Sequence, residues 1–445
     1  MPDKQTEGPA TVRRCATQVG EADGRWSWVE PSVWTTRMLE ALDKGVKGGV
    51  WFSLIDKVYS QRAMAAAFAK VKANHGSAGV DRQTVEMFEK HREEHLIDLQ
   101  KRLMAGTYQP QGIKRVWIPK PGKKEKRPLG IPTIKDRTVQ TALRNVLEPI
   151  FERDFADCSY GFRPGRGCKD ALGQVSHRLS EGYLHVVDAD IKGFFDTLSH
   201  ARLMQKLQLK IADSRVLELV EQYLKQGVIE TTGTWQPEKG TPQGAVISPL
   251  LSNIYLDEFD WEMQRRGYAL VRYADDWVIL CKSGEEAQEA LKAAEQWMGE
   301  ASLTLHPEKT RVVDLNQPKT GFDFLGYHFR KEAVYPSWKS KQKLRGKLKP
   351  KTKRANGRSM DAIITDLNKS LRGWFEYFKD ATRKSLDDVD GWIRGRLRSI
   401  LRKRRRGKGR GRGRDHQRWP NEYFAKLGLF SLARARDKAI QSYAR

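Results

Sequence analysis

Residues 270–281 read LVRYADDWVILC, which is two short apolar runs separated by the adjacent carboxylates Asp275 and Asp276. The runs 270–274 and 277–281 predict two buried strands, and the charged pair between them predicts a hairpin tip. Two neighbouring carboxylates repel each other, and one reason to keep such a pair is to hold a divalent metal. A solvated turn, in which aspartate is common, is the plainer interpretation of this pair taken alone.

A second set of carboxylates follows another apolar run. Residues 182–191 predict a buried strand that ends near Asp190, with Asp188 two residues earlier on the same face. Taken alone, this segment also fits a strand followed by a helix cap. Together, Asp190, Asp275 and Asp276 predict three carboxylates on adjacent strands, which suits a two-metal site for phosphoryl or nucleotidyl transfer.

Charge is distributed unevenly along the 445 residues. The chain holds 81 Lys and Arg against 55 Asp and Glu, a net charge of +26. Residues 331–445 hold 34 basic and 11 acidic residues, a net of +23, so residues 1–330 carry only +3. Nucleic acid is the usual partner of such a basic region. An anionic membrane is the rival, but membrane binding more typically uses one amphipathic basic helix.

Several protein classes do not fit the sequence. No run of 18 apolar residues exists, which argues against a membrane span, and residues 1–24 have no apolar stretch of the kind a secretory signal needs. The four cysteines (Cys15, Cys158, Cys168 and Cys281) are scattered, which argues against a disulfide scaffold and a zinc finger. This cysteine usage predicts a reducing cytoplasm.

The remaining pattern predicts a mixed α and β chain. Residues 113–119 and 127–132 predict a hairpin around the turn 120–124. Helical periodicity is expected over 56–72, 84–104, 138–151, 201–209, 214–226, 246–259, 285–298 and, most regularly, 361–378.

Two segments predict little regular structure. Residues 1–24 predict disorder. The glycine- and arginine-rich segment 402–414, with nine basic and no acidic residues, predicts a flexible phosphate-binding strap or a solvated tail.

At this point a resemblance emerges. Asp190, followed five residues later by Phe195 and then by the motif at 273–276, resembles the palm of a reverse transcriptase. The resemblance extends over approximately residues 55–445, and the motifs occur in the family's order. The blocks similar to those of bacterial group II intron reverse transcriptases are RPLGIP (127–132), SYGFRPGRG (159–167), GTPQG (240–244), FLGY (324–327) and, similar to the maturase-specific region, LRGWFEYF (371–378).

The resemblance implies an α+β right-hand polymerase fold. Fingers and palm with an antiparallel sheet are expected over 51–335, after a partly disordered N-terminal extension over 1–50. An α-helical thumb/maturase domain is expected over 336–406, and a basic nucleic-acid-binding segment over 407–445.

The resemblance also implies the roles of the carboxylates. Asp190, Asp275 and Asp276 would form the catalytic triad and hold two Mg²⁺ ions, with Mn²⁺ as the alternative metal and the backbone carbonyl of Ile191 as a further ligand. In the family two of the three bind both metals, and Asp276 is expected to act mainly through its field and position. Asp188 is not expected to be a ligand.

The deoxynucleotide would meet five side chains. Lys120 and Arg127 on the hairpin would contact its phosphates, and Gln243 would approach it where Gly244 leaves the backbone room. Phe195 would clash with a 2′-OH, and Lys309 would donate a proton near the leaving pyrophosphate. Core packing is the plainer interpretation of Phe195, and a solvated turn that of Lys120.

Two further sets of residues are expected to contact the strands. Phe324, Leu325 and Gly326 resemble the primer grip. Arginines in the motifs and in the basic region are expected to bind nucleic acid: Arg163, Arg166, Arg372, Arg404, Arg405, Arg406 and Arg410.

The leading hypothesis is an RNA-directed DNA polymerase that is also a maturase. Its expected partners are a group II intron RNA, an RNA template with a DNA primer, target DNA and deoxynucleotides, in the bacterial cytoplasm or nucleoid and with no membrane; the oligomeric state stays open. No cysteine follows Cys281, unlike relatives with a His-Asn-His endonuclease, so this chain is not expected to cut target DNA.

Three alternatives stay open beside this hypothesis. A splicing-only RNA-binding protein is disfavoured because the triad and Phe195 are intact. A non-intron reverse transcriptase of defence or repair would share the chemistry, and an RNA-dependent RNA polymerase is opposed by the bulky Phe195.

Overall fold

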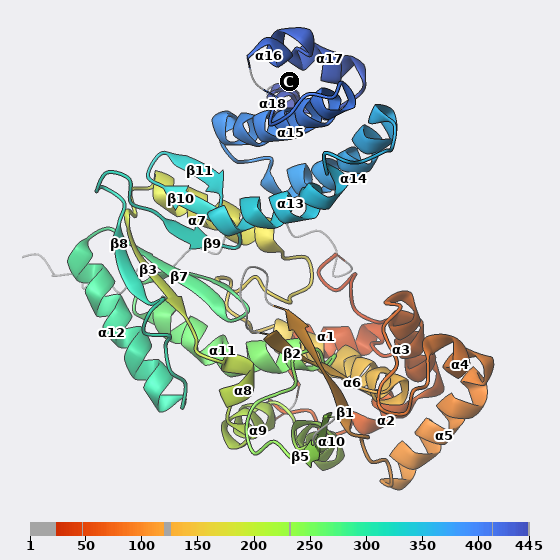
Figure 1. The fold of residues 1–445 in the computed structure, drawn as a ribbon. Helices are drawn as coiled ribbons and strands as arrows, with labels where there is room; N and C mark the ends of the chain where they lie inside the picture. Colours follow the sequence, from red (N-terminus) through yellow and green to blue (C-terminus); the bar gives the residue numbers. More distant parts are fainter. Residues whose placement is uncertain (1–23, 47, 120–125, 231–232, 412, 444–445) are drawn as a thin grey trace, which may run out of the picture.

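A computed structural model describes residues 24–46, 48–119, 126–230, 233–411 and 413–443. Three small sheets and three groups of helices make up the described part of the chain (Figure 1). The α+β expectation is therefore confirmed. The disorder predicted for residues 1–23 and the predicted turn at 120–124 lie outside the described residues. Within the described part, no helix has the length and hydropathy needed to cross a bilayer.

The first group contains the expected hairpin. Strands β1 (Ile113–Pro119) and β2 (Lys126–Ile131) are antiparallel, as predicted, and β1 also pairs in parallel with β4 (Val228–Glu230), which pairs with β5 (Gly233–Trp235). The predicted helix over 56–72 is divided at Ser60, whose hydroxyl accepts a hydrogen bond from the Ala63 amide and starts a new helix. The helices of this group are α1 (Thr36–Lys44), α2 (Ile55–Tyr59), α3 (Gln61–Ala73), α4 (Val85–Lys90), α5 (Arg92–Ala105) and α6 (Ile134–Glu152).

The second group is built on a four-stranded antiparallel sheet with the order β6-β7-β3-β8. Side chains of β3 alternate between two cores: Val187 joins one hydrophobic cluster and Val186 the other. Because both faces are covered, the strands are nearly continuous apolar runs. The strands are β3 (His185–Asp190), β6 (Ala269–Tyr273), β7 (Asp276–Cys281) and β8 (Arg311–Asp314); the helices are α7 (Cys168–Ser180), α8 (Phe194–Thr197), α9 (His200–Gln208), α10 (Ser214–Leu224), α11 (Ser248–Arg265) and α12 (Gly284–Glu300).

The third group follows a small sheet with the order β11-β10-β9. The predicted amphipathic helix is α14, whose residues Ile363, Leu367, Leu371 and Phe375 are buried. Trp374 is half-buried against the same core. The strands are β9 (Phe322–Phe324), β10 (Tyr327–Arg330) and β11 (Ala333–Pro336); the helices are α13 (Trp338–Lys351), α14 (Met360–Phe378), α15 (Arg383–Arg404), α16 (Arg414–Arg418), α17 (Asn421–Lys426) and α18 (Leu432–Tyr443).

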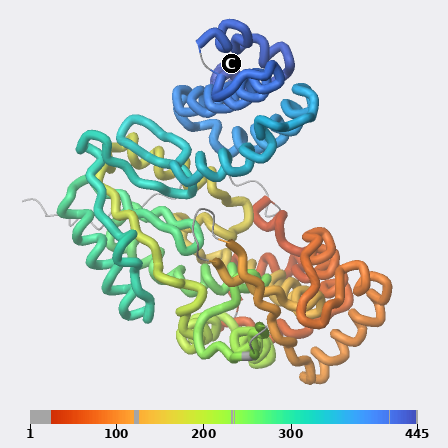
Figure 2. The backbone as a smooth tube through the Cα atoms, viewed as in Figure 1, coloured from red at the N-terminus to blue at the C-terminus, as the bar shows by residue number. Residues whose placement is uncertain are grey.

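The hydrophobic cores do not follow the boundary expected at residue 335. The second cluster joins one face of the four-stranded sheet, at Val278 and Leu280, to the small sheet and to helices α13–α15. Figure 2 traces the small-sheet segment, in teal, between the blue helices and the rest of the chain. The helical group is thus packed on the sheet that carries Asp190, which fixes its position relative to that sheet.

The expected N-terminal extension is part of the first core from Gly24 onward. Trp26, Trp34 and Leu42 are buried in the first cluster. The indole of Trp34 donates a 2.9 Å hydrogen bond to the carbonyl of Asn145 in α6. Residues 24–50 therefore pack with the first group rather than extending from it.

The strap or solvated tail is expected over 402–414, and residues 405–411 of that segment are mostly exposed and lie outside any helix, so the structure differs from the expectation only on either side of them. Helix α15 continues to Arg404, and helices α16–α18 form a lobe that buries Trp419, Phe424 and Leu432 in the second cluster. Asp390 of α15 accepts hydrogen bonds from the amides of Leu432 (3.1 Å) and Ala433 and so starts α18. The sequence did not predict this lobe, because its few apolar residues are spaced between charged ones and follow a segment rich in glycine and arginine.

Candidate active site

The three predicted carboxylates meet at one end of the four-stranded sheet. Strand β3 ends at Asp190 and β7 begins at Asp276, and the antiparallel register places these two residues directly opposite each other. Asp275 lies in the turn that joins β6 to β7. Since the strands are held by a continuous ladder, the sheet presents the carboxylates on a rigid support.

The turn before Asp275 is tight. Ala274 has φ +59°, a left-handed conformation that is uncommon outside glycine. Gly161 of the SYGFRPGRG block packs against it: a Cβ at Gly161 would lie 2.3 Å from the Ala274 nitrogen. Only glycine fits at this contact, so the block supports the turn from outside.

A buried arginine holds the turn from inside, and sequence analysis missed it. Arg272 is 1% exposed and pairs with Asp260 of α11, with the guanidinium Nε 2.6 Å from the carboxylate. It also donates to the carbonyl of Ala274 (2.9 Å) and to the side chain of Asn253. A charged residue inside an apolar strand was the signal available in the sequence.

Burial and the neighbouring carboxylates raise the pKa of Asp276 and Asp275. Desolvation and the charges of Asp275, Asp190 and Asp188 raise the pKa of Asp276 to about 7, although its side chain keeps contact with solvent. The pKa of Asp275 is raised by burial and by Asp190, and Arg127 and Arg272 oppose that shift. Concentrated negative charge of this kind favours a bound cation.

Two cations already compensate part of this charge. Lys309 donates to a carboxylate oxygen of Asp190. Arg311, at the start of β8, pairs with Asp188 at 3.0 Å, so Asp188 has a partner of its own. That Asp188 is not a metal ligand stays a prediction.

The donor set fits a hard divalent ion that brings part of its own shell. In the described residues, no group of three or more His, Cys, Asp or Glu side chains forms a preformed metal cage. Mg²⁺ uses one or two carboxylates together with water and substrate phosphates, so Asp190, Asp275 and Asp276 suit it without such a cage. The backbone at Ile191 is fixed by a bridge to Leu305, which leaves its carbonyl as a predicted ligand.

Gln243 lies in the loop between β5 and α11, and this loop bonds both to β2 and to the segment that holds Phe195. The carbonyl of Gln243 accepts from the Gly130 amide (2.6 Å), and the amide of Thr241 donates to the carbonyl of Phe195 (2.6 Å). Gln243 therefore lies between the hairpin and Phe195, which is half-buried against Phe194. Arg127 is exposed on β2, and its charge acts on Asp275; Lys120 lies outside the described residues.

The residues expected to grip the primer form the turn between β9 and β10. Leu325 and Gly326 both have positive φ, and Phe324 is buried. The Gly326 carbonyl accepts from the Ser337 amide and the Ser340 hydroxyl. The turn is therefore held from the helical side of the molecule.

The prediction that Arg163 contacts nucleic acid is wrong. Its side chain is 3% exposed, pairs with Glu152 at 2.8 Å and donates to the carbonyls of Ala156 and Ser159. All its donors serve the protein, so it is a structural residue. Arg166 donates a hydrogen bond to the carboxylate of Asp157. The remaining predicted arginines are exposed: Arg372, Arg404, Arg405, Arg406 and Arg410.

A thiol between two tyrosines was also missed. Cys168, at the start of α7, lies close enough to Tyr273, beside the carboxylate turn, and Tyr377, on α14, that together with burial it raises the pKa of both tyrosines. Tyr273 ends β6 of the four-stranded sheet and Tyr377 belongs to α14, so this contact joins the sheet to the helical domain. Sequence spacing could not bring residues 168, 273 and 377 together.

Two family models match the chain. The model described as reverse transcriptase (RNA-dependent DNA polymerase) matches residues 118–329. The model described as group II intron, maturase-specific domain matches residues 341–419. The second match runs past the boundary expected at residue 406 and includes the buried Trp419.

The chain is similar to two curated proteins and, more distantly, to a solved structure. The chain is 35% identical over 297 residues to "Protein YkfC" of Escherichia coli (strain K12). The aligned region covers 58% of this chain and 77% of that protein. It is 41% identical over 199 residues to "Group II intron-encoded protein LtrA" of Lactococcus lactis subsp. cremoris, which covers 44% of this chain and 32% of that protein. Among solved structures, a telomerase from Candida albicans is 13% identical with a TM-score of 0.43, covering 72% of this chain and 62% of that one.

Proposed function

The chain belongs to the family of group II intron-encoded reverse transcriptases and maturases, and we propose that it copies an RNA template into DNA and assists the splicing of the intron RNA that it binds. The observation that carries the polymerase is the register pair Asp190–Asp276 with Asp275 in the adjoining turn. Reverse transcriptases generally use divalent metal ions, and two Mg²⁺, or Mn²⁺ as the alternative, would be held by these three carboxylates. When bound, the metals would neutralise the triphosphate and activate the primer 3′-OH.

The chain's own residues would position the reactants. Arg127 and Lys120 would bind the triphosphate, Gln243 would contact the nucleotide, and Phe195 would exclude a 2′-OH. The primer 3′-OH would lose its proton to solvent, the bond from its oxygen to the α-phosphorus would form as the bond to the bridging oxygen breaks, and pyrophosphate would leave. Lys309, beside Asp190, would give the leaving group its proton.

The helical domain would hold the RNA. Its exposed arginines supply contacts to phosphate, and the maturase-specific match over 341–419 supports intron RNA as the ligand. We further propose that the protein supports intron mobility by copying the intron RNA from a primer at target DNA, in the bacterial cytoplasm at the nucleoid.

One variant tests the polymerase. Asp275→Asn should reduce primer extension on an RNA template by at least about a hundredfold, because the site loses a metal-binding charge, while RNA affinity changes little. Asp361→Asn, an exposed carboxylate at the start of α14, is the matched control. Wild-type-like extension by Asp275→Asn would refute the site. RNA binding by wild-type protein without any extension would support the splicing-only alternative.

A further inference from the structure

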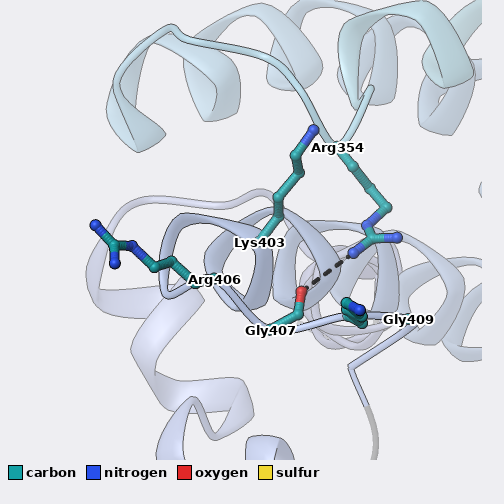
Figure 3. A pocket seen from close by; sticks show the side chains of 6 residues that line it. Arg354, Lys403, Arg406, Gly407 and Gly409 are labelled. Atoms are coloured by element: carbon teal, nitrogen blue, oxygen red, sulfur yellow. Dashed lines mark hydrogen bonds between the residues drawn. The ribbon is translucent and has the colours of Figure 1, made fainter.

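A cavity of about 320 Å³ lies where the loop after α13 meets the end of α15. Its lining is unusual because it contains cations and glycines but no acid and no apolar side chain. The lining residues are Arg354, Lys403, Arg406, Gly407, Lys408 and Gly409. Figure 3 shows Arg354 and Lys403 on opposite sides of this space, with Arg406 extending in another direction from the same turn.

The walls of the cavity are held together by main-chain contacts. Arg354 donates to the carbonyl of Gly407 at 3.4 Å, the dashed line in Figure 3. Arg404 donates to the carbonyl of Arg358, so the loop and the helix end are joined twice. A Cβ at Gly407 would lie 2.7 Å from the Arg402 side chain, which makes this turn dependent on glycine. The cavity is therefore built into the fold.

The end of a helix normally repels an anion because its last carbonyls are free. Here the carbonyl of Leu401 accepts from the Arg405 amide, that of Arg402 from the Gly407 amide, and that of Lys403 from the Arg406 amide. These bonds turn the carbonyl dipoles into the chain. The Gly407 carbonyl at the cavity is bonded as well, to Arg354, so the carbonyls named here are occupied and the cavity is lined by side-chain cations.

Nearby acids are already paired elsewhere. Asp415 pairs with Arg402 at 2.5 Å, and Asp366 pairs with Lys351 at 2.7 Å. Among the residues described, no carboxylate lies within ion-pair distance of Lys403 or Lys408. Three or four uncompensated cations around one cavity repel one another, and an anion in the cavity would relieve that repulsion.

The geometry points to a binding site for a single phosphate group of an RNA backbone, held by Arg354, Lys403 and Lys408. This inference rests on the proposed function, because it assigns a place on the helical domain where the intron RNA is held. Among the described residues, no aromatic or apolar one lines the cavity, so bases find no stacking surface there. Recognition here is of phosphate and is independent of RNA sequence.

Lysine reactivity tests the cavity without any RNA. Full-length protein is acylated with and without inorganic phosphate, and each lysine is read by mass spectrometry. Phosphate should protect Lys403 and Lys408 several-fold but leave Lys426, an exposed lysine on α17, unchanged. Equal reactivity of Lys403 and Lys408 with and without phosphate would overturn the site, whatever RNA the protein binds.

Salt titration tests the single phosphate. If Lys403 and Lys408 share one phosphate, the pair Lys403→Gln with Lys408→Gln should lower the slope of log K against log salt for structured RNA by about 0.7–0.9. The control pair, Lys369→Gln with Lys426→Gln, removes the same charge from exposed positions. An unchanged slope, a loss about twice as large, or an equal loss in the control would each overturn the inference.

Matched readouts separate this inference from the proposed function. Lys403→Arg should restore binding, because it keeps the charge. Equal thermal unfolding midpoints exclude a folding defect. Phosphate protection without any affinity for intron RNA would refute the maturase proposal and leave the phosphate cavity standing, but would overturn its assignment to RNA.

Discussion

The hydroxyl of Tyr377 donates a 2.7 Å hydrogen bond to the main-chain carbonyl of Leu325. The contact is reciprocal, since the hydroxyl of Tyr327 donates to the carbonyl of Tyr377. Helix α14 of the maturase-specific domain therefore fixes the turn that is expected to hold the primer. The position of the primer end should depend on this helical domain as well as on the catalytic sheet.

Tyr377→Phe should loosen the primer turn while leaving the core intact. The variant loses the hydrogen bond to Leu325, a cost of about 1 kcal/mol in unfolding free energy. We expect the KM for primer–template to rise several-fold, with a smaller change in kcat. Tyr423→Phe, on the half-buried α17 tyrosine, is the control. Equal KM values for the two variants would show that Tyr377 only stabilises the fold.

Phe195→Ala should relax the choice of sugar. Removing the ring opens space beside Asp190, so we expect the ratio of kcat/KM for ribonucleotides over deoxynucleotides to rise at least about tenfold. Steady-state extension with each nucleotide measures the ratio. A ratio equal to that of wild type would place the sugar gate on another residue.

Stability should fall with rising pH in the absence of divalent metal. The pKa of Asp276 is raised to about 7 from 3.8, so the folded protein binds a proton that the unfolded chain does not. That contribution is complete below about pH 4 and is lost as the pH rises through about 7. Thermal unfolding with a chelator should show a midpoint that decreases between pH 6.5 and 8, and Mg²⁺ should reverse the decrease.

Asp276→Asn is the control for this pH dependence. Asp257 has a pKa raised to about 6 and contributes with the same sign, but mostly below this window. The variant should therefore have a nearly flat midpoint from pH 6.5 to 8. An equal slope in wild type and variant would assign the titration to another group.

Arg163→Gln should destabilise the fold rather than weaken RNA binding directly. The change leaves Glu152 without its buried partner, which costs about 3–5 kcal/mol. Chemical denaturation should show this loss, and the salt dependence of RNA binding by the folded fraction should match wild type. A smaller salt slope with unchanged stability would restore Arg163 as a phosphate contact.

Sequence patterns predicted most elements around the carboxylates because apolar runs, breakers and charges there alternate clearly. The hairpin 113–132, the strands on either side of Asp275 and the helix at 360–378 all follow local rules. Arg163 could not be placed correctly, because a glycine-rich block with arginines reads the same whether the guanidinium meets phosphate or buried carbonyls. Arg272 could be placed only once Asp260, twelve residues earlier, was known to lie beneath it.

The C-terminal lobe was missed for a different reason. Its stability comes from contacts between distant residues, such as Asp390 with the amides at 432 and 433, and not from local periodicity. The basic composition predicted a charged surface for this segment but not the burial of Phe424 and Leu432. Truncating the chain before this lobe would therefore test folding rather than RNA contacts.

The packing of Leu432 and Phe424 against α14 and α15 also sets an order of events during synthesis. When a ribosome has made residues 338–404, those helices still lack the layer that covers them. The maturase-specific domain can close only after residues 421–443 have left the exit tunnel. Nascent chains should consequently complete the fold of this domain only after translation of this lobe.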